Sequence, residues 1–167
     1  MKKIVLGSVV ALIMTGLIFS GDPSFAQKAG QQTMAAPDFN LRDLSGREIR
    51  MSQYRGKPVL LIFGTTWCPN CRTQIPENKK LYERYAGRGL VVFNINILES
   101  REKAASFARK WKLPYPTLVD VNGKVAEMYG VVGVPMRFLV DSEGNITCMS
   151  CRNLEEKINQ ALAVSRK

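Results

Sequence analysis

The sequence of 167 residues contains no histidine and only four cysteines. Lys and Arg outnumber Asp and Glu by 24 to 14, which gives a formal net charge of +10, yet the basic residues form no dense run and are not interleaved with aromatic side chains. This scatter argues against a nucleic-acid-binding protein and favours solvated surface charge, which also attracts acidic partners or an anionic membrane surface. Because the sequence has no internal repeat either, its length predicts one domain with a proper core and short extensions.

The first residues have the three parts of a secretory signal peptide. "MKK" is a short basic start, residues 4–19 form an unbroken apolar run, and Ser24 and Ala26 stand at the two positions that signal peptidase reads. We therefore expect residues 1–26 to be a signal peptide, cleaved before Gln27. The alternative is an uncleaved membrane anchor, for which the apolar run is slightly short. In both cases the domain is expected in the periplasm or another extracytoplasmic space, and the lack of a cysteine near the cut argues against a lipoprotein.

The remaining sequence predicts a flexible tether over residues 27–36 and a single domain over residues 37–167. Within the domain, strand and helix patterns alternate and then give way to an antiparallel pair of strands before a last helix. This order predicts an α/β fold in which helices cover both faces of a mixed sheet. The expected elements are a β-hairpin around "DLSGR", a buried strand at 58–63, a helix at 69–85, a strand at 90–96, a helix at 100–113, an extended segment at 117–120, a short helix at 123–130, two strands joined by the turn 141–144, and a final helix that Asn153 and Glu156 would open with a capping box.

The segment "FGTTWCPNCRTQIP" (63–76) places two cysteines at the start of a helix. The strand before it ends at Phe63 and Pro69 suits the first helical position, so Cys68 lies at the helix N-terminus. Free backbone N–H groups and the helix dipole stabilise a thiolate there. Cys71 follows one turn later and points inward, ready to attack a mixed disulfide formed at Cys68. The pattern therefore predicts a redox-active pair.

Two structural interpretations of this pair are weaker. A bridge across two residues constrains the unfolded chain little, so it would be a poor static disulfide. Zinc ribbons separate their two CxxC pairs by about 15–20 residues, whereas Cys71 and Cys148 are much further apart and no histidine can complete a site. We therefore expect neither a metal nor another bound cofactor.

The sequence "APDFNLRDLSGREIRMSQYRGKPVLLIFGTTWCPNCRTQIP" resembles the opening of the TlpA/ResA-like thioredoxin-fold family. That family comprises exported thiol–disulfide oxidoreductases related to cytochrome c maturation. The similarity continues through "VVFNINILESREKAASFARKW" and "GVPMRFLVDSEGNI", from about Ala36 to Ile146. It implies a thioredoxin-like fold with an added N-terminal β-hairpin.

The resemblance also implies roles for individual residues. Cys68 would be the attacking thiol and Cys71 the resolving thiol. The Val134–Pro135 peptide would be cis, would face the cysteines and would pair with an extended substrate. Trp67 would belong to the docking surface, although an ordinary packing role is the alternative.

The acids around the pair depart from the pattern of these proteins. Ile62 stands where thioredoxin has a buried Asp, and Gln74 stands where ResA-like members often have an acid. Glu99 matches a family acid near the cysteines, and a carboxylate there could accept or relay the proton of Cys71. Alternatively, Glu99 is simply the acid at the N-terminus of the next helix.

The segment "TCMSC" (147–151) repeats the two-residue spacing with Cys148 and Cys151. If residues 137–140 pair with 146–149 across the turn, Cys151 lies opposite Pro135, where it would influence the active site. A disulfide between these cysteines requires a turn, because residues three apart in a straight strand cannot be bridged. Three interpretations remain open: a local structural disulfide, an auxiliary redox pair that exchanges with Cys68 or a partner, and free thiols or a metal site.

These features predict an extracytoplasmic enzyme that exchanges disulfides with protein clients, most readily as a reductant. Apocytochrome c is one candidate client, and a membrane thiol–disulfide reductant would have to recharge the enzyme. The alternatives are a thiol peroxidase-like antioxidant enzyme and a metal-binding chaperone that uses the four thiols as ligands.

Overall fold

The computed structural model describes residues 34–165. The predicted signal peptide, residues 1–26, and most of the predicted tether lie outside the described residues. The end of that tether differs from the prediction, because Met34 and Ala35 form a short strand, β1, and the side chain of Ala36 is buried. The folded domain therefore includes residues that the sequence analysis assigned to the tether.

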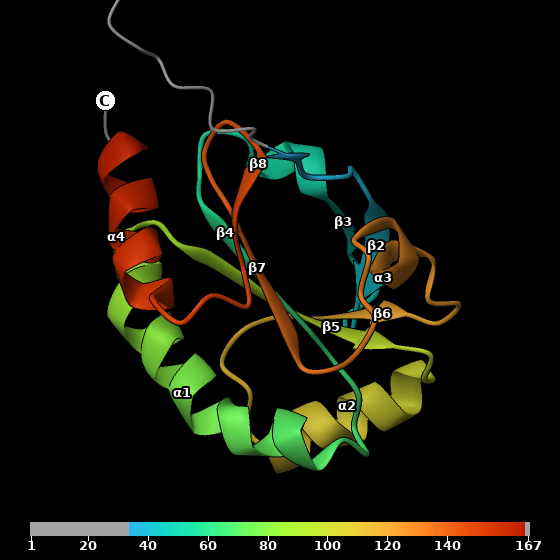
Figure 1. The fold of residues 1–167 in the computed structure, drawn as a ribbon. Coiled ribbons are helices and arrows are strands. Elements are labelled where there is room, and N and C mark those ends of the chain that lie inside the picture. Colours follow the sequence, from blue (N-terminus) through green and yellow to red (C-terminus); the bar gives the residue numbers. More distant parts are fainter. Residues whose placement is uncertain (1–33, 166–167) are drawn as a thin grey trace, which may run out of the picture. The chain divides into compact units, whose positions relative to one another are not determined.

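Over residues 34–165, eight strands form one mixed sheet in the order β1-β8-β7-β4-β5-β6-β2-β3 (Figure 1). The central strand β4 is parallel to β5 and antiparallel to β7, and β5 is parallel to β6. The predicted mixed sheet is therefore confirmed. The strands are β1 (Met34–Ala35), β2 (Asn40–Asp43), β3 (Glu48–Arg50), β4 (Val59–Gly64), β5 (Val91–Ile97), β6 (Thr117–Asp120), β7 (Met136–Val140) and β8 (Asn145–Met149).

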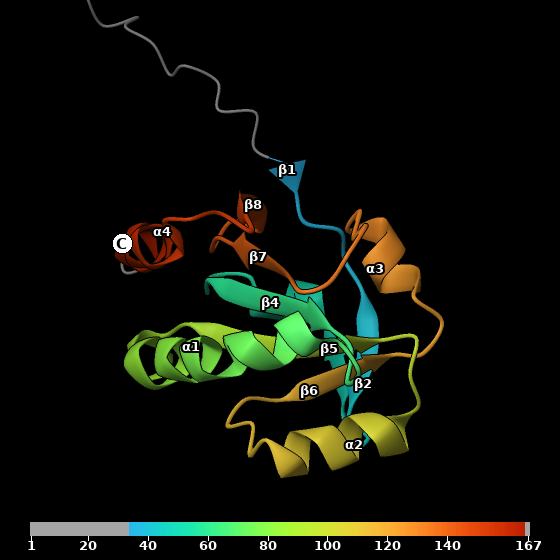
Figure 2. The same ribbon diagram turned by 60° about the horizontal axis from the view of Figure 1, so that its bottom comes forward.

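Helices cover both faces of this sheet, as predicted. In Figure 1 and in Figure 2, α1 and α4 lie on the left of the central strands and α3 lies on their right. Alternate side chains of β4 serve the two faces: Leu60 and Ile62 pack in a cluster with α1 and α4, whereas Val59, Leu61 and Phe63 pack in a cluster with α3 and the hairpin. The helices are α1 (Pro69–Tyr85), α2 (Arg101–Lys110), α3 (Lys124–Met128) and α4 (Leu154–Val164), with short 3-10 turns at Met51–Tyr54 and Ala86–Arg88.

The predicted N-terminal hairpin is formed by β2 and β3. The Asp43 carboxylate holds its turn by accepting hydrogen bonds from the backbone N–H groups of Ser45 and Arg47, at 2.8 and 3.0 Å. β2 also pairs antiparallel with β6, so the hairpin extends the sheet beyond its parallel strands.

The start of α4 differs in detail from the prediction. Asn153 is the N-cap residue, but its side chain accepts no hydrogen bond from the helix backbone. Instead, Asn153 Nδ2 donates to Glu156 Oε2 at 3.1 Å, so the two side chains pair with each other and the expected capping box is not formed. The helices within residues 34–165 are all too short or too polar to cross a bilayer.

Candidate active site

Cys68 lies at the junction between the central strand and the helix that follows it. β4 ends at Gly64, and α1 begins at Pro69 with Cys68 as its N-cap residue. The backbone N–H of Cys71 donates to Cys68 Sγ at 3.2 Å, and Cys68 Sγ in turn lies 3.6 Å from the carbonyl oxygen of Val134, to which its thiol donates. The Cys68 sulfur is therefore held between a helix N-terminus and the loop that precedes β7. The first turn of α1 thus directs a backbone N–H at the Cys68 sulfur, at the helix end where negative charge is stabilised.

Cys71 is half-buried against the end of β4, while Cys68 itself is 5% exposed. A Cβ built on Gly64 would lie only 3.3 Å from Cys71 Sγ, so the end of β4 has room for this sulfur because residue 64 has no side chain. Burial, together with a hydrogen bond with Cys68, raises the pKa of the Cys71 thiol to about 12. Cys71 therefore keeps its proton at neutral pH. Both cysteines are free thiols in this structure.

The peptide bond between Val134 and Pro135 is cis, as the resemblance implies. Pro135 and Cys71 line one small cavity of about 20 Å³, together with Thr65, Asn94 and other residues of the central strands. The hydroxyl of Thr65 and the amide nitrogen of Asn94 are buried without a hydrogen-bond partner. A cavity of this volume holds about one water molecule, and these two polar atoms are suited to bind it.

Two exposed apolar side chains belong to the segments that meet at the cysteines. Trp67, directly before Cys68, is 66% exposed, and Val132, in the loop that leads to Pro135, is 98% exposed. The exposure of Trp67 argues against the packing role that the sequence left open. The sequence did not predict a role for Val132, since a single valine in a loop belongs to no recognisable pattern.

Glu99 is buried and supports the segment before the cysteines instead of contacting them. Its carboxylate accepts hydrogen bonds from the Thr66 N–H (2.7 Å), the Thr66 hydroxyl (2.5 Å) and Asn96 Nδ2 (2.6 Å). No hydrogen bond joins Glu99 to Cys71 among the described residues. Ser100, not Glu99, caps α2. Glu99 does stand directly before this N-cap, and its contacts position Thr66 and, through it, the loop that carries Cys68.

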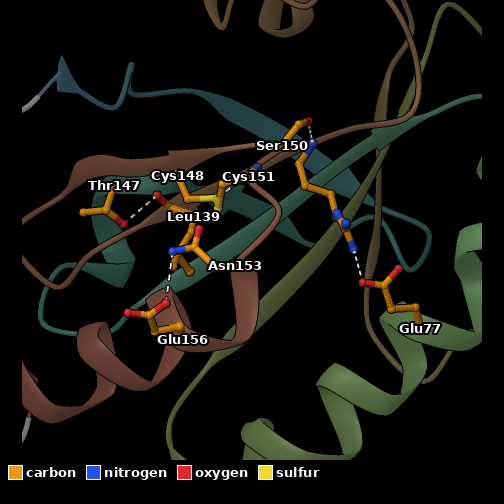
Figure 3. The surroundings of a disulfide bond; sticks show 9 residues. Glu77, Leu139, Thr147, Cys148, Ser150, Cys151, Asn153 and Glu156 are labelled. Carbon is orange, nitrogen blue, oxygen red and sulfur yellow. Dashed lines mark hydrogen bonds and ion pairs between the residues drawn. A yellow bond between two sulfur atoms is a disulfide. The ribbon is translucent and has the colours of Figure 1, made fainter.

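Cys148 and Cys151 form a disulfide, with their Cα atoms 5.7 Å apart (Figure 3). The turn that this bond requires is present, because Ser150 has a φ of +46°. Cys151 donates its backbone N–H to Cys148 Sγ at 3.4 Å, as Cys71 does to Cys68. Of the three open interpretations, the structure therefore contains the bonded form.

The position of this disulfide corrects the predicted register. Leu139 pairs with Cys148 and Val140 with Ile146, because an irregularity between Leu139 and Val140 shifts the pairing by one residue. β8 then ends at Met149, so Cys151 does not pair opposite Pro135. Leu139 also pairs with Leu60 of β4.

The disulfide is consequently remote from Cys68. Through Leu139, Cys148 lies at the same level of the sheet as Leu60. Leu60 is four residues before Gly64, the end of β4, a distance of about 13 Å along the strand. Cys148 is buried in the apolar cluster under α4. Ser150, one of the two residues between the cysteines, is nevertheless linked to α1 through Arg137. Ser150 donates its N–H to the Arg137 carbonyl at 2.8 Å, and Arg137 Nη1 donates to Glu77 Oε1 at 2.9 Å. Figure 3 shows Ser150, the disulfide and Glu77 along this path.

The fold and the CxxC pair at a helix N-terminus define a thioredoxin-like protein, and comparison with known proteins places it more narrowly. Residues 33–149 match the AhpC/TSA family. The chain is 33% identical over 150 residues to the thiol-disulfide oxidoreductase ResA of Geobacillus thermodenitrificans, covering 87% of this chain and 85% of ResA. It is 34% identical to the thioredoxin-like protein YneN of Bacillus subtilis, covering 77% of this chain and 79% of YneN.

Solved structures agree with these relatives. The thiol:disulfide interchange protein DsbE of Chlorobium tepidum superposes with a TM-score of 0.73 at 28% identity, covering 78% of this chain and 96% of that one. The protein belongs to the AhpC/TSA family and, within it, to the ResA-like thiol–disulfide oxidoreductases. The expected fold, family and enzyme class are thereby confirmed.

Proposed function

We propose that this protein reduces disulfides in protein clients outside the cytoplasm, with Cys68 as nucleophile and Cys71 as resolving thiol. The observation that carries the proposal is the unequal environment of the two sulfurs. Cys68 Sγ receives a backbone hydrogen bond at the start of α1, whereas desolvation and a hydrogen bond with Cys68 raise the pKa of the half-buried Cys71 thiol. A two-step exchange requires one thiol that attacks as a thiolate and a second thiol that stays protonated until it resolves the mixed disulfide.

In the first step, the Cys68 thiolate attacks one sulfur of the client disulfide. A Cys68–client bond forms, the client disulfide breaks, and the other client sulfur leaves as a thiolate. In the second step, Cys71 loses its proton and attacks Cys68 Sγ, which releases the second client thiol. The client has then gained two electrons and two protons, and the enzyme carries a Cys68–Cys71 disulfide.

The second step needs a route for the Cys71 proton. Ile62 and Gln74 supply no carboxylate, and among residues 34–165 no acid is hydrogen-bonded to Cys71, since Glu99 binds Thr66 and Asn96. The small cavity beside Cys71 offers an alternative, since a water molecule bound by Thr65 and Asn94 would accept the proton.

Client binding would use the surface around Cys68. When Cys68 enters a mixed disulfide, its hydrogen bond to the Val134 carbonyl is lost, and this oxygen becomes free to accept from the backbone of an extended client. The exposed side chains of Trp67 and Val132 would contact the client on either side. An oxidised enzyme needs a thiol donor, for which a membrane thiol–disulfide reductant is suited. The family resemblance of the sequence makes apocytochrome c one candidate client, and the N-terminal segment supports an extracytoplasmic location.

Insulin reduction in the presence of dithiothreitol tests the proposal. Cys68→Ser should abolish catalysis, Cys71→Ser should accumulate mixed disulfides, and Cys148→Ala/Cys151→Ala should remain active as the matched control. Full activity of Cys68→Ser would refute the assignment, and hydrogen peroxide turnover at a comparable rate would favour a peroxidase. Equilibrium of the Cys68/Cys71 pair with glutathione, read as its redox potential, decides whether the enzyme is a reductant.

A further inference from the structure

A groove of about 430 Å³ opens beside the active site, between the segment that precedes Cys68 and one face of α2. Its volume lies within the roughly 300–1,000 Å³ that is typical of ligand sites. Six of its residues are basic or aromatic: Trp67, Arg72, Lys103, Phe107, Lys110 and Trp111.

The α2 residues of this groove form one continuous stripe. Their spacing of three or four positions places them on a single helix face: Lys103, Phe107, Lys110 and Trp111. On this face the two lysine side chains are exposed and the two aromatic rings are half-buried. The rings of Phe107 and Trp111 contact each other, with centroids 6.1 Å apart. The groove thus combines an aromatic surface with exposed ammonium groups.

Arg72 is held at the opposite side of the groove. Its guanidinium donates two hydrogen bonds to the Thr66 carbonyl, from Nε at 3.1 Å and from Nη2 at 2.8 Å. This anchoring holds a cation of the first turn of α1 against the segment that leads to Trp67 and Cys68.

The positive charge of the groove is not neutralised by the protein. Four ion pairs occur among residues 34–165, and none of them includes Arg72, Lys103 or Lys110. The one acid in the groove, Glu99, is 8% exposed and accepts hydrogen bonds from Thr66 and Asn96. The complementary ligand is therefore anionic.

We propose that this groove binds an acidic stretch of the client, next to the cysteine that Cys68 attacks, with an apolar client side chain against the rings of Phe107 and Trp111. The proposal rests on the proposed function. Because Trp67 adjoins both Cys68 and the groove, a client that exchanges its disulfide with Cys68 places the residues next to its own cysteine at the groove. An anionic membrane seated on this surface would instead cover Cys68 and exclude clients, which is why the charge favours an acidic peptide.

Three disulfide peptides test this specificity. They share one sequence and differ only in the three residues beside the attacked cysteine, which are acidic, neutral or basic. The reduced wild-type enzyme should have the highest kcat/KM for the acidic peptide, about tenfold above that for the basic one at low salt, and the difference should shrink at high salt.

Two adjacent residues of α2 provide a matched pair of variants. Lys110→Glu reverses a charge in the groove, whereas Arg109→Glu makes the same change on another face, beside Arg101 and Ala105. Both side chains are exposed. Lys110→Glu should lower kcat/KM for the acidic peptide by about three- to tenfold and raise it for the basic one, while Arg109→Glu should leave the preference of the wild type within about twofold.

The outcomes separate the groove from the chemistry. Hydroxyethyl disulfide, which is neutral and too small to reach the groove, should be reduced equally by all three proteins, so it reports whether Cys68 still reacts. If the wild type reduces no peptide, the proposed function fails. If it reduces all three at one rate, or if Arg109→Glu and Lys110→Glu have equal effects, the groove proposal fails. It is also overturned if Lys110→Glu weakens binding to anionic vesicles and leaves the peptide rates unchanged.

Discussion

Removal of the second disulfide by Cys148→Ala/Cys151→Ala should destabilise the domain and spare the active site. The bond joins residues three apart in sequence, and for a loop of about four residues the chain-entropy relation gives about 2 kcal/mol. Unfolding of about 130 residues carries an entropy of about 0.3 kcal/mol per kelvin, so this loss lowers Tm by about 7 °C. Since Cys148 is buried among apolar side chains, its truncation adds to the loss.

The assay is a thermal melt in a Cys68→Ser/Cys71→Ser background, where Cys148–Cys151 is the remaining disulfide. The oxidised and reduced forms of that protein have the same side chains, so their difference isolates the cross-link from the packing. When Cys68 and Cys71 are retained, Cys148→Ala/Cys151→Ala should leave the redox potential of the Cys68/Cys71 pair within about 10 mV of the wild-type value, because the disulfide is remote from Cys68. A Tm change under about 2 °C, or a potential shift above about 30 mV, would refute this reasoning and favour a second redox function.

Three further changes act on the active site itself. In Cys68→Ser, alkylation of Cys71 by iodoacetamide should rise about tenfold per pH unit from pH 7 to 10, because burial raises the thiol pKa and the thiolate fraction grows with pH; a plateau by pH 9 would contradict the burial argument. Glu99→Gln should cost about 1–3 kcal/mol in a urea melt and slow insulin reduction, because an amide cannot accept from every donor that the carboxylate binds, and an unchanged melt would contradict this. Gly64→Ala should slow resolution of mixed disulfides, since its Cβ would crowd Cys71 Sγ, whereas Gly87→Ala, which has open space, is the control and should not.

Local patterns were sufficient to predict most of the fold. The apolar run at β4, the helix that follows Pro69 and the hairpin around Asp43 each depend on neighbours in sequence, so their positions agree closely with the structure. The same holds for Cys68, because the residues that place it at a helix N-terminus are adjacent to it.

What the sequence did not predict depends on contacts across the fold. Met34 and Ala35 lack any strand pattern and become a strand only by pairing with β8. The shifted register of Cys148 arises from one irregular residue between two strands, which leaves no mark on the alternation of side chains. Glu99 lies next to a helix start in sequence, but its partner Thr66 comes from a loop more than thirty positions earlier.

The short pairing of β1 with β8 also has a consequence for solubility. An unpaired edge strand offers its backbone N–H and C=O groups to a second molecule and so invites sheet-to-sheet aggregation. Met34 and Ala35 occupy this edge at Ile146 and Asn145, and the turn at Ser150 ends β8 a few residues later. The length of β8 that a neighbouring molecule could extend is therefore small. A shortened chain that starts at Pro37 would uncover this edge, so Met34 and Ala35 protect it from pairing with a second molecule.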